Sequence, residues 1–203
     1  MKPIRNFAVV LVLILASSRL VRAQEVDAFF GLGSAHASSN GQQIDTFGDG
    51  TLYPTSGIGG AFTDLGANFF FNRQIGAGWT GAWKFNSTNY AGLQYHTSFH
   101  TFDAIVEPSA IRTRHFAPEI RAGIGFSGVH FDEPDPVSCS QVPGCPDSYF
   151  FVGHLAGAAR FYFTNHIFLR PAIDVNYVHD LYPFGSHWVP RYSMSVGYSF
   201  GRE

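Results

Sequence analysis

The last strand-like segment constrains the fold of this chain more than any other feature. Between residues 191 and 200, apolar and polar side chains alternate without a break. One face carries Tyr192, Met194, Val196, Tyr198 and Phe200, and the other carries Arg191, Ser193, Ser195, Gly197 and Ser199. Because side chains alternate across a strand with a period of two, this segment predicts a strand with one apolar and one polar face. The pattern recurs about eight times, which is typical of a barrel with apolar residues outside and polar residues inside.

The recurring pattern predicts a set of eight strands. Their ranges are 26–34, 59–71, 75–85, 90–102, 114–128, 149–163, 167–179 and 191–200. Most are close to the roughly 9–11 residues that a tilted strand needs to cross a membrane. We therefore predict an all-β fold, an eight-stranded antiparallel up-and-down transmembrane β-barrel.

The amino terminus has the features of an export signal. Lys2 and Arg5 precede an apolar run over 7–16, which is short for a membrane-spanning helix. Val21-Arg22-Ala23 fits a cleavage site. We expect a signal peptide over 1–23 and a single barrel domain over 24–203. The alternative is an uncleaved membrane anchor.

Charge argues against a nucleic-acid partner. Four of the 13 basic residues and none of the 15 acidic residues lie in the first 23 positions. The remainder therefore has nine basic and 15 acidic residues, a formal net charge of −6. A nucleic-acid-binding surface would require a basic excess.

The predicted connections alternate in length. Residues 72–74 and 164–166 form tight turns, whereas 35–58, 129–148 and 180–189 are longer and rich in Gly, Pro, Asp and Ser. Short periplasmic turns and long external loops are the arrangement of outer-membrane barrels. The sequence therefore predicts that both termini lie on the periplasmic side.

The fourth strand is the irregular one. Its apolar face is predicted to carry Leu93, Tyr95, Thr97 and Phe99. Continued alternation would then direct Asp103 and Glu107 toward lipid, at a cost of up to about 2–4 kcal/mol per charge. We expect either an end near Phe102 or a bulge that reverses the alternation.

The alternation directs a nearly balanced set of charges into the barrel. They are Asp27, Asp64, Lys84, Glu119, Arg121, Arg160, Arg170, Asp174 and Arg191. The interior of an eight-stranded barrel is narrow enough to be filled by side chains. We therefore predict a plugged interior with ion pairs, with Glu119 or Asp174 joined to Arg121, Arg160 or Arg170. The alternative is a narrow ion path.

Aromatic residues gather near the predicted strand ends. They are Trp79, Trp83, Phe85, Tyr95, Phe99, Tyr177, Tyr192, Tyr198 and Phe200. We interpret them as aromatic girdles at the two membrane interfaces. Lining of a ligand pocket is the alternative.

The mature chain resembles the small outer-membrane β-barrels of the OmpA/OmpX-like group. The resemblance rests on the signal peptide, P-x-I-x-A-G-x-G at 118–125, L-x-P-x-I-x-x-x-Y at 169–177 and the closing M-S-V-G-Y-S-F. It implies an outer-membrane location in a diderm bacterium, lipid as partner, and insertion by the barrel assembly machinery. This chain departs from the terminal Phe usual in that family, because Phe200 is followed by Gly201-Arg202-Glu203.

Few residues are candidates for a disulfide, a metal site or catalysis. Cys139 and Cys145 are the only cysteines, and an oxidising compartment favours a disulfide between them, with two free thiols or a metal clip as the alternatives. We expect no metal, cofactor or catalytic site. His96-Thr97-Ser98 resembles the His-x-Ser element of outer-membrane lipid A deacylases, with Phe99 in place of their following Asn. An enzyme of that kind would need His96, Ser98 and a carboxylate within hydrogen-bond reach of one another on the outer surface, whereas the predicted alternation directs His96 inward.

Together these features predict a non-enzymatic, structural or surface-interaction protein with long extracellular loops, whose ligand the sequence does not identify. The main alternative is a soluble lipocalin-like periplasmic binder, which would need its charges outside and Phe69, Trp83 and Ile173 inside. A narrow pore and a lipid A-modifying enzyme are the minor alternatives.

Overall fold

The computed structural model describes residues 25–37, 43–44, 50–54, 58–90, 93–132, 147–179 and 186–202. The predicted signal peptide and the Cys139–Cys145 disulfide lie outside these residues. The elements are β1 Glu25–Ala35, β2 Gln43–Ile44, β3 Tyr53–Pro54, β4 Gly60–Phe70, β5 Ile75–Lys84, β6 Thr88–Tyr90, β7 Leu93–Val106, the 3₁₀ turn η1 Ser109–Ile111, β8 Phe116–Asp132, β9 Asp147–Tyr162, β10 Ile167–Val178 and β11 Trp188–Phe200. No helix within the described residues is long and apolar enough to cross a membrane.

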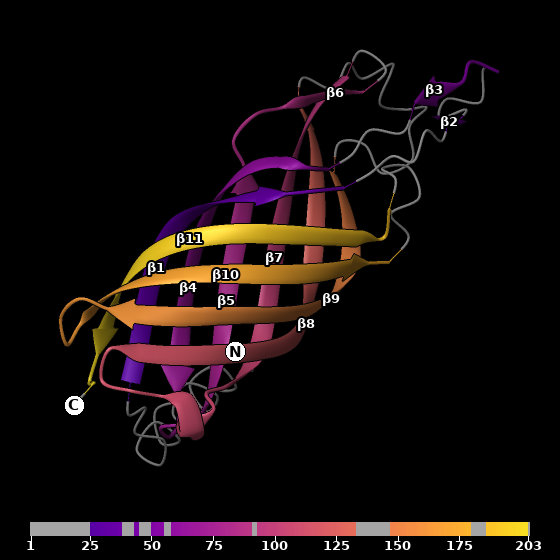
Figure 1. Cartoon of the computed structure of the whole chain (residues 1–203). Coiled ribbons are helices and arrows are strands. Elements are labelled where there is room, and N and C mark those ends of the chain that lie inside the picture. The colour runs from indigo at the N-terminus through magenta and orange to yellow at the C-terminus, as the bar shows by residue number, and fades with distance from the viewer. Residues whose placement is uncertain are drawn as a thin grey trace, which may run out of the picture.

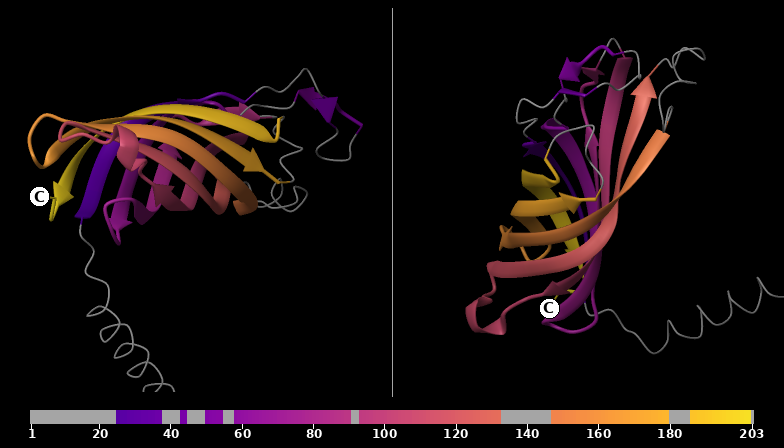
Figure 2. Two further views of the ribbon diagram at one scale, coloured as in Figure 1. Left: turned by 60° about the horizontal axis from the view of Figure 1, so that its bottom comes forward. Right: turned by 90° about the vertical axis from the view of Figure 1, so that its right-hand side faces the viewer.

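The eight long strands form a closed antiparallel barrel. Each pairs with its sequence neighbour, β1 pairs with β11, and the order is β5-β4-β1-β11-β10-β9-β8-β7, with the short β6 beside β7. The sheet closes where β5 pairs with β7, from Ile75 opposite Val106 to Trp83 opposite Ser98. Figures 1 and 2 show the sheet curling round until its edges meet. The predicted fold class is confirmed, and predicted and observed strand bounds differ by a few residues.

The tight connections lie at one end of the barrel. Asn72 Oδ1 accepts hydrogen bonds from the backbone N–H groups of Gln74 and Ile75, both at 2.8 Å, which closes the β4–β5 turn. Thr164 Oγ1 accepts the Ile167 N–H in the β9–β10 turn. The β7–β8 connection, which contains η1, and the carboxy terminus lie at this same end (Figure 1). We call it the turn end and the opposite end the loop end.

The barrel has apolar residues outside and charged residues inside. Outward-facing Phe30, Ile120 and Leu155 are 58%, 60% and 59% exposed, whereas Asp27 and Arg160 are 0% exposed. A soluble barrel has the reverse arrangement. The lipocalin-like alternative is wrong, because Phe69, Trp83 and Ile173 are all on the outside.

The face assigned to the fourth strand is wrong. In β7, Tyr95, Thr97 and Phe99 are 0–1% exposed and point into the barrel, and alternation then directs Asp103 and Glu107 inward as well. The β7–β8 register runs unbroken from Gln94 opposite Asp132 to Val106 opposite Ile120, so the predicted reversal by a bulge is absent.

The outward face of β7 accommodates histidine by aromatic packing. The His100 ring stacks on Phe126 and Trp79, with centroids 4.7 and 6.1 Å apart, and meets the edge of Trp83. This packing covers a polar ring with aromatic surface, so an outward His100 is compatible with a lipid-facing position.

Two prolines lie inside strands without shifting the register. Pro118 lies beyond the last β7–β8 pair, where β8 pairs only with β9. At Pro171 the β9–β10 ladder lacks two pairs and resumes in the same register at Ala172 opposite Ala158. Both positions limit the number of ladder hydrogen bonds that proline removes.

Candidate functional site in the barrel interior

Arg160 is the centre of the charge cluster nearest the turn end. Its guanidinium lies 2.6 Å from Glu25 Oε1 and 2.8 Å from Glu119 Oε1, and it also contacts the carboxylates of Asp27 and Glu107. The guanidinium lies over the Phe70 ring, 4.6 Å from the centroid. All four carboxylates are buried. One cation is therefore shared among four buried carboxylates, of which Glu25 and Glu107 also pair with Arg112, and Glu119 with Arg170.

A second cluster surrounds His154 and Arg121 near the middle of the barrel. His154 Nδ1 lies 2.6 Å from Asp103 Oδ1, and Nε2 lies 3.1 Å from Asp174 Oδ1. Arg121 lies 3.4 Å from Asp103 Oδ2 and donates to Asn68 Oδ1 at 3.0 Å. The histidine ring thus links carboxylates from β7 and β10 across the interior.

Two further ion pairs complete the network. Arg170 pairs with Glu119 at 3.2 Å and lies over the Phe29 ring. Arg191 pairs with Asp64 at 2.5 Å, near the loop end of β4 and β11. Removing one partner of such a buried pair would leave an uncompensated charge inside the barrel.

An apolar layer lies above the charges, toward the loop end. Its ten buried residues come from every long strand and from Ile58; they are Ala35, Ile58, Phe62, Ala82, Tyr95, Phe99, Val129, Val152, Val178 and Val189. The Phe62 and Phe99 rings pack with centroids 5.8 Å apart. A second, smaller apolar cluster of Phe29, Ala117, Tyr162 and Phe168 lies nearer the turn end, so both charged and apolar side chains fill the interior.

Of the nine charges predicted to point inward, eight are 0–6% exposed. Lys84 is half-buried at the loop end, with Nζ 5.8 Å from the Tyr95 ring centroid. Four interior residues that matter were not predicted: Glu25, Asp103, Glu107 and His154. Glu25 precedes the predicted start of the first strand. Asp103 and Glu107 were missed because the inner face of β7 was assigned wrongly. The alternation on β9 would have identified His154, which faces inward between outward neighbours.

The aromatic residues predicted to form girdles fall into an outward-facing group and a buried group. Trp79, Trp83, Phe85, Tyr177, Tyr192, Tyr198 and Phe200 lie on the outward face, most of them 37–57% exposed. Tyr95 and Phe99 were wrongly assigned to a girdle, because both are buried in the apolar layer at the loop end.

The outer surface near the loop end carries a cluster of polar side chains. His96 Nδ1 lies 2.8 Å from Asp132 Oδ2 on the neighbouring strand, and His130 Nδ1 lies 2.6 Å from Asp147 Oδ1. Ser98 shares the outward face of β7 with His96. A cavity of about 250 Å³ there is lined by His96, Ser98, His130 and Asp147, among others. The predicted inward direction of His96 is therefore wrong. No group of three or more potential metal ligands occurs in the described part of the chain.

Known structures share this architecture at low sequence identity. Ail, the attachment invasion locus protein of Yersinia pestis, superposes with a TM-score of 0.54 at 13% identity, covering 87% of this chain and 98% of Ail. OprG from Pseudomonas aeruginosa gives a TM-score of 0.58 at 14% identity, covering 87% and 95%. Neisserial surface protein A gives 0.53 at 13%, covering 87% and 96%. No family model and no curated protein matches the sequence.

The closed strand order, the exposed apolar surface and the charged interior define a transmembrane β-barrel. The chain has the fold of the small eight-stranded barrels of the OmpA/OmpX-like kind, which are proteins of the Gram-negative outer membrane.

Proposed function

We propose that this protein is a non-enzymatic outer-membrane barrel with a sealed interior, and that its role lies in surface interactions of the loop end. The observation that carries the proposal is the layered interior: a buried ion-pair network below an apolar layer of ten residues. Ions crossing such a barrel would have to break the pairs around Arg160 and then enter an apolar layer.

The orientation follows from the unequal ends of the barrel. Tight turns lie at one end and long connections at the other, and in outer-membrane barrels the short turns face the periplasm. Assembly by the barrel assembly machinery, which reads a closing aromatic strand, fits β11, where Tyr192, Tyr198 and Phe200 face outward.

Conductance in planar lipid bilayers tests the sealed interior. We expect no discrete current steps from the reconstituted protein under conditions in which a general-diffusion porin conducts. Regular single-channel steps would overturn this part of the proposal.

Antibody access on intact cells tests the orientation. An epitope inserted within 133–146 should be detected on unbroken cells, whereas the same epitope inserted in the 72–74 turn should be detected only after lysis. The opposite result would contradict the proposed orientation.

A second candidate function is hydrolysis of an acyl ester of a membrane lipid. It is favoured by His96, Ser98 and Asp132, which lie on the outer surface near the loop end. Asp132 engages Nδ1 of His96, so Nε2 is the nitrogen that could accept the Ser98 hydroxyl proton. In the proposed orientation, both side chains face the outer leaflet of the membrane near the lipid headgroups. The shared outward face of His96 and Ser98 and the contact between His96 and Asp132 support this candidate, which would also need the Ser98 hydroxyl to come within hydrogen-bond reach of His96.

Fatty-acid release from purified lipid A, measured by mass spectrometry, tests this second candidate. Release by the wild type that is lost in Ser98→Ala and His96→Ala, but kept in His130→Ala, would establish it. The His130 variant is a matched control because that residue forms the neighbouring His–Asp pair. Absence of release, or release by all three variants, would exclude it.

A further inference from the structure

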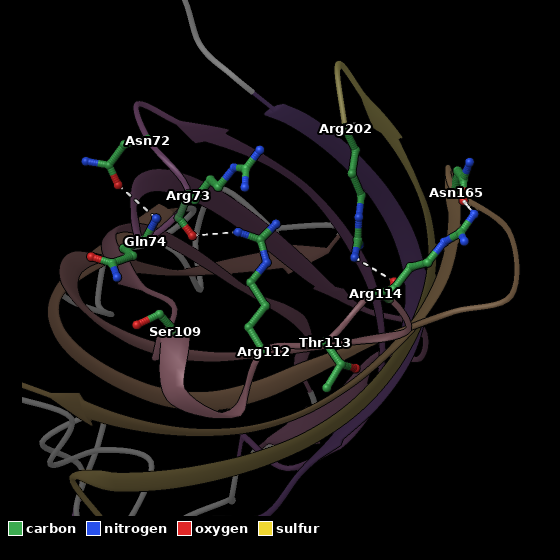
Figure 3. A pocket seen from close by; sticks show the side chains of 9 residues that line it. All are labelled: Asn72, Arg73, Gln74, Ser109, Arg112, Thr113, Arg114, Asn165 and Arg202. Atoms are coloured by element: carbon green, nitrogen blue, oxygen red, sulfur yellow. Dashed lines mark hydrogen bonds between the residues drawn. The ribbon is translucent and has the colours of Figure 1, made fainter.

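A cavity lined by arginines lies at the turn end of the barrel. Its volume is about 810 Å³, and its lining residues come from the β4–β5 turn, the β7–β8 connection, the β9–β10 turn and the carboxy-terminal tail (Figure 3). They are Asn72, Arg73, Gln74, Ser109, Arg112, Thr113, Arg114, Asn165 and Arg202. Four of the nine are arginines and none is acidic. We call this site the arginine bowl.

Hydrogen bonds to backbone and amide oxygens hold the arginines in place. Arg112 Nη1 donates to the Arg73 carbonyl at 2.6 Å, and Arg202 Nη2 donates to the Arg114 carbonyl at 2.9 Å. Arg114 Nη2 donates to Asn165 Oδ1 at 3.2 Å. Figure 3 shows Arg112 reaching toward Arg73 and Arg202 reaching toward Arg114 across the bowl. Arginines from separate segments are therefore held together before any ligand arrives.

The charge of the bowl is only partly compensated. Arg112 pairs with Glu25 at 3.1 Å and with Glu107 at 3.3 Å. Both acids also contact Arg160, so they are shared. Arg73, Arg114 and Arg202 have no ion pair with a carboxylate among the described residues. The bowl thus keeps an excess of positive charge.

Arg202 shows the clearest need for an anion. Its guanidinium lies over the Tyr162 ring, 3.2 Å from the centroid, and its buried Nη1 has no hydrogen-bond partner in the described part of the chain. Burial, opposed by Glu25 and reinforced by the nearby cations Arg160 and Arg112, lowers the pKa of Arg202 to about 10. A bound oxyanion would offset the repulsion among these cations.

We propose that the arginine bowl binds a small multivalent oxyanion, bearing phosphate or closely spaced carboxylate groups, on the periplasmic side. The planar guanidinium presents paired donors that match the oxygens of such groups. The volume is in the range of small-molecule sites, and Asn72, Gln74 and Thr113 add neutral hydrogen-bonding groups. The periplasmic location rests on the orientation proposed above, but the anion site itself does not.

Two sources could supply this chemistry, a free solute or the headgroup of an anionic lipid. Titration calorimetry with pyrophosphate distinguishes them, using the full mature protein in nanodiscs of either phosphatidylcholine or phosphatidylcholine with phosphatidylglycerol. Saturable binding in both discs identifies a free-solute site. Binding in neutral discs that is lost in phosphatidylglycerol discs identifies a site already occupied by headgroups.

Single substitutions locate the site. Arg202→Gln and Arg114→Gln should each weaken pyrophosphate binding about tenfold or more, because each removes a charge-assisted contact. Lys84→Gln is the matched control, since it removes one positive charge at the opposite end of the barrel and should leave the dissociation constant unchanged. Unboiled gel migration verifies that each variant is folded. No saturable binding in neutral discs, or equal weakening by Lys84→Gln, would overturn the proposal.

Discussion

Replacing Arg160 with methionine tests the interior network at its most connected point. Methionine is close in length and removes the charge, so the carboxylates of Glu25, Asp27, Glu107 and Glu119 lose their shared cation. Removing one partner of a buried ion pair costs about 3–5 kcal/mol. We expect a decrease in the free energy of unfolding of that size at pH 7, which is more than a hundredfold in the equilibrium constant.

The decrease in the free energy of unfolding caused by Arg160→Met should be smaller in acid. Protonation in acid neutralises carboxylates that have lost their cation, which removes the repulsion among them in the variant. The same protons weaken the wild type, because they discharge the partners of Arg160. The gap between the two proteins is therefore largest at neutral pH and narrows toward pH 4.

Urea titration of the protein folded in phosphocholine bilayers measures this effect, with boiled and unboiled gel migration reporting the folded fraction. Arg114→Met, an exposed arginine at the turn end, is the control and should change stability by less than about 0.5 kcal/mol. Adding Glu119→Gln to Arg160→Met should recover part of the loss. An Arg160→Met variant within about 1 kcal/mol of the wild type at pH 7 would refute the reasoning, since 3 kcal/mol is the lower bound expected.

Three further predictions address the walls of the barrel. Ile124→Arg, at an outward position that is 59% exposed, should cost about 2–4 kcal/mol in a bilayer, whereas Ile111→Arg in η1 should cost little; equal costs in urea titration would contradict a lipid-facing β8. In a Cys139→Ser, Cys145→Ser background, a maleimide should label His96→Cys in the folded protein but Tyr95→Cys only after unfolding, because His96 lies on the outer surface near the loop end and Tyr95 is buried; the reverse order would restore the originally predicted face of β7. Gly78→Ala should cost about 1–3 kcal/mol, because its Cβ would lie 2.2 Å from Arg121 Nη2, while Gly153→Ala meets no atom within 4 Å and should be tolerated in the same titration.

The sequence predicted the barrel because period-two alternation is local. Seven of the eight strands show one face that is clearly apolar, so their direction could be assigned from residues such as Ile173, Asp174 and Val175. The fourth strand could not be assigned this way, because Tyr95 and Phe99 on one face compete with His96 and His100 on the other. Only Asp103 and Glu107, farther along the strand, identify the inner face.

The site was predicted in composition but not in detail. Alternation shows that Arg160 and Glu119 point inward, but which acids meet Arg160 depends on the register and closure of strands far apart in sequence. Glu25 and Arg160, separated by 135 positions, are joined only by the closed barrel. The arginine bowl is harder still to predict, because its residues lie in turns where no periodicity applies.

Quenching of tryptophan fluorescence by brominated acyl chains tests the central claim, that the apolar face of this barrel contacts lipid and its charges lie inside. Trp79, Trp83 and Trp188 all lie on the outer surface. Reconstitution into bilayers with brominated chains should therefore strongly quench the emission of the protein, and a water-soluble quencher should have little effect. Emission that is unchanged by brominated lipid, from a protein recovered in the soluble fraction, would contradict the membrane barrel.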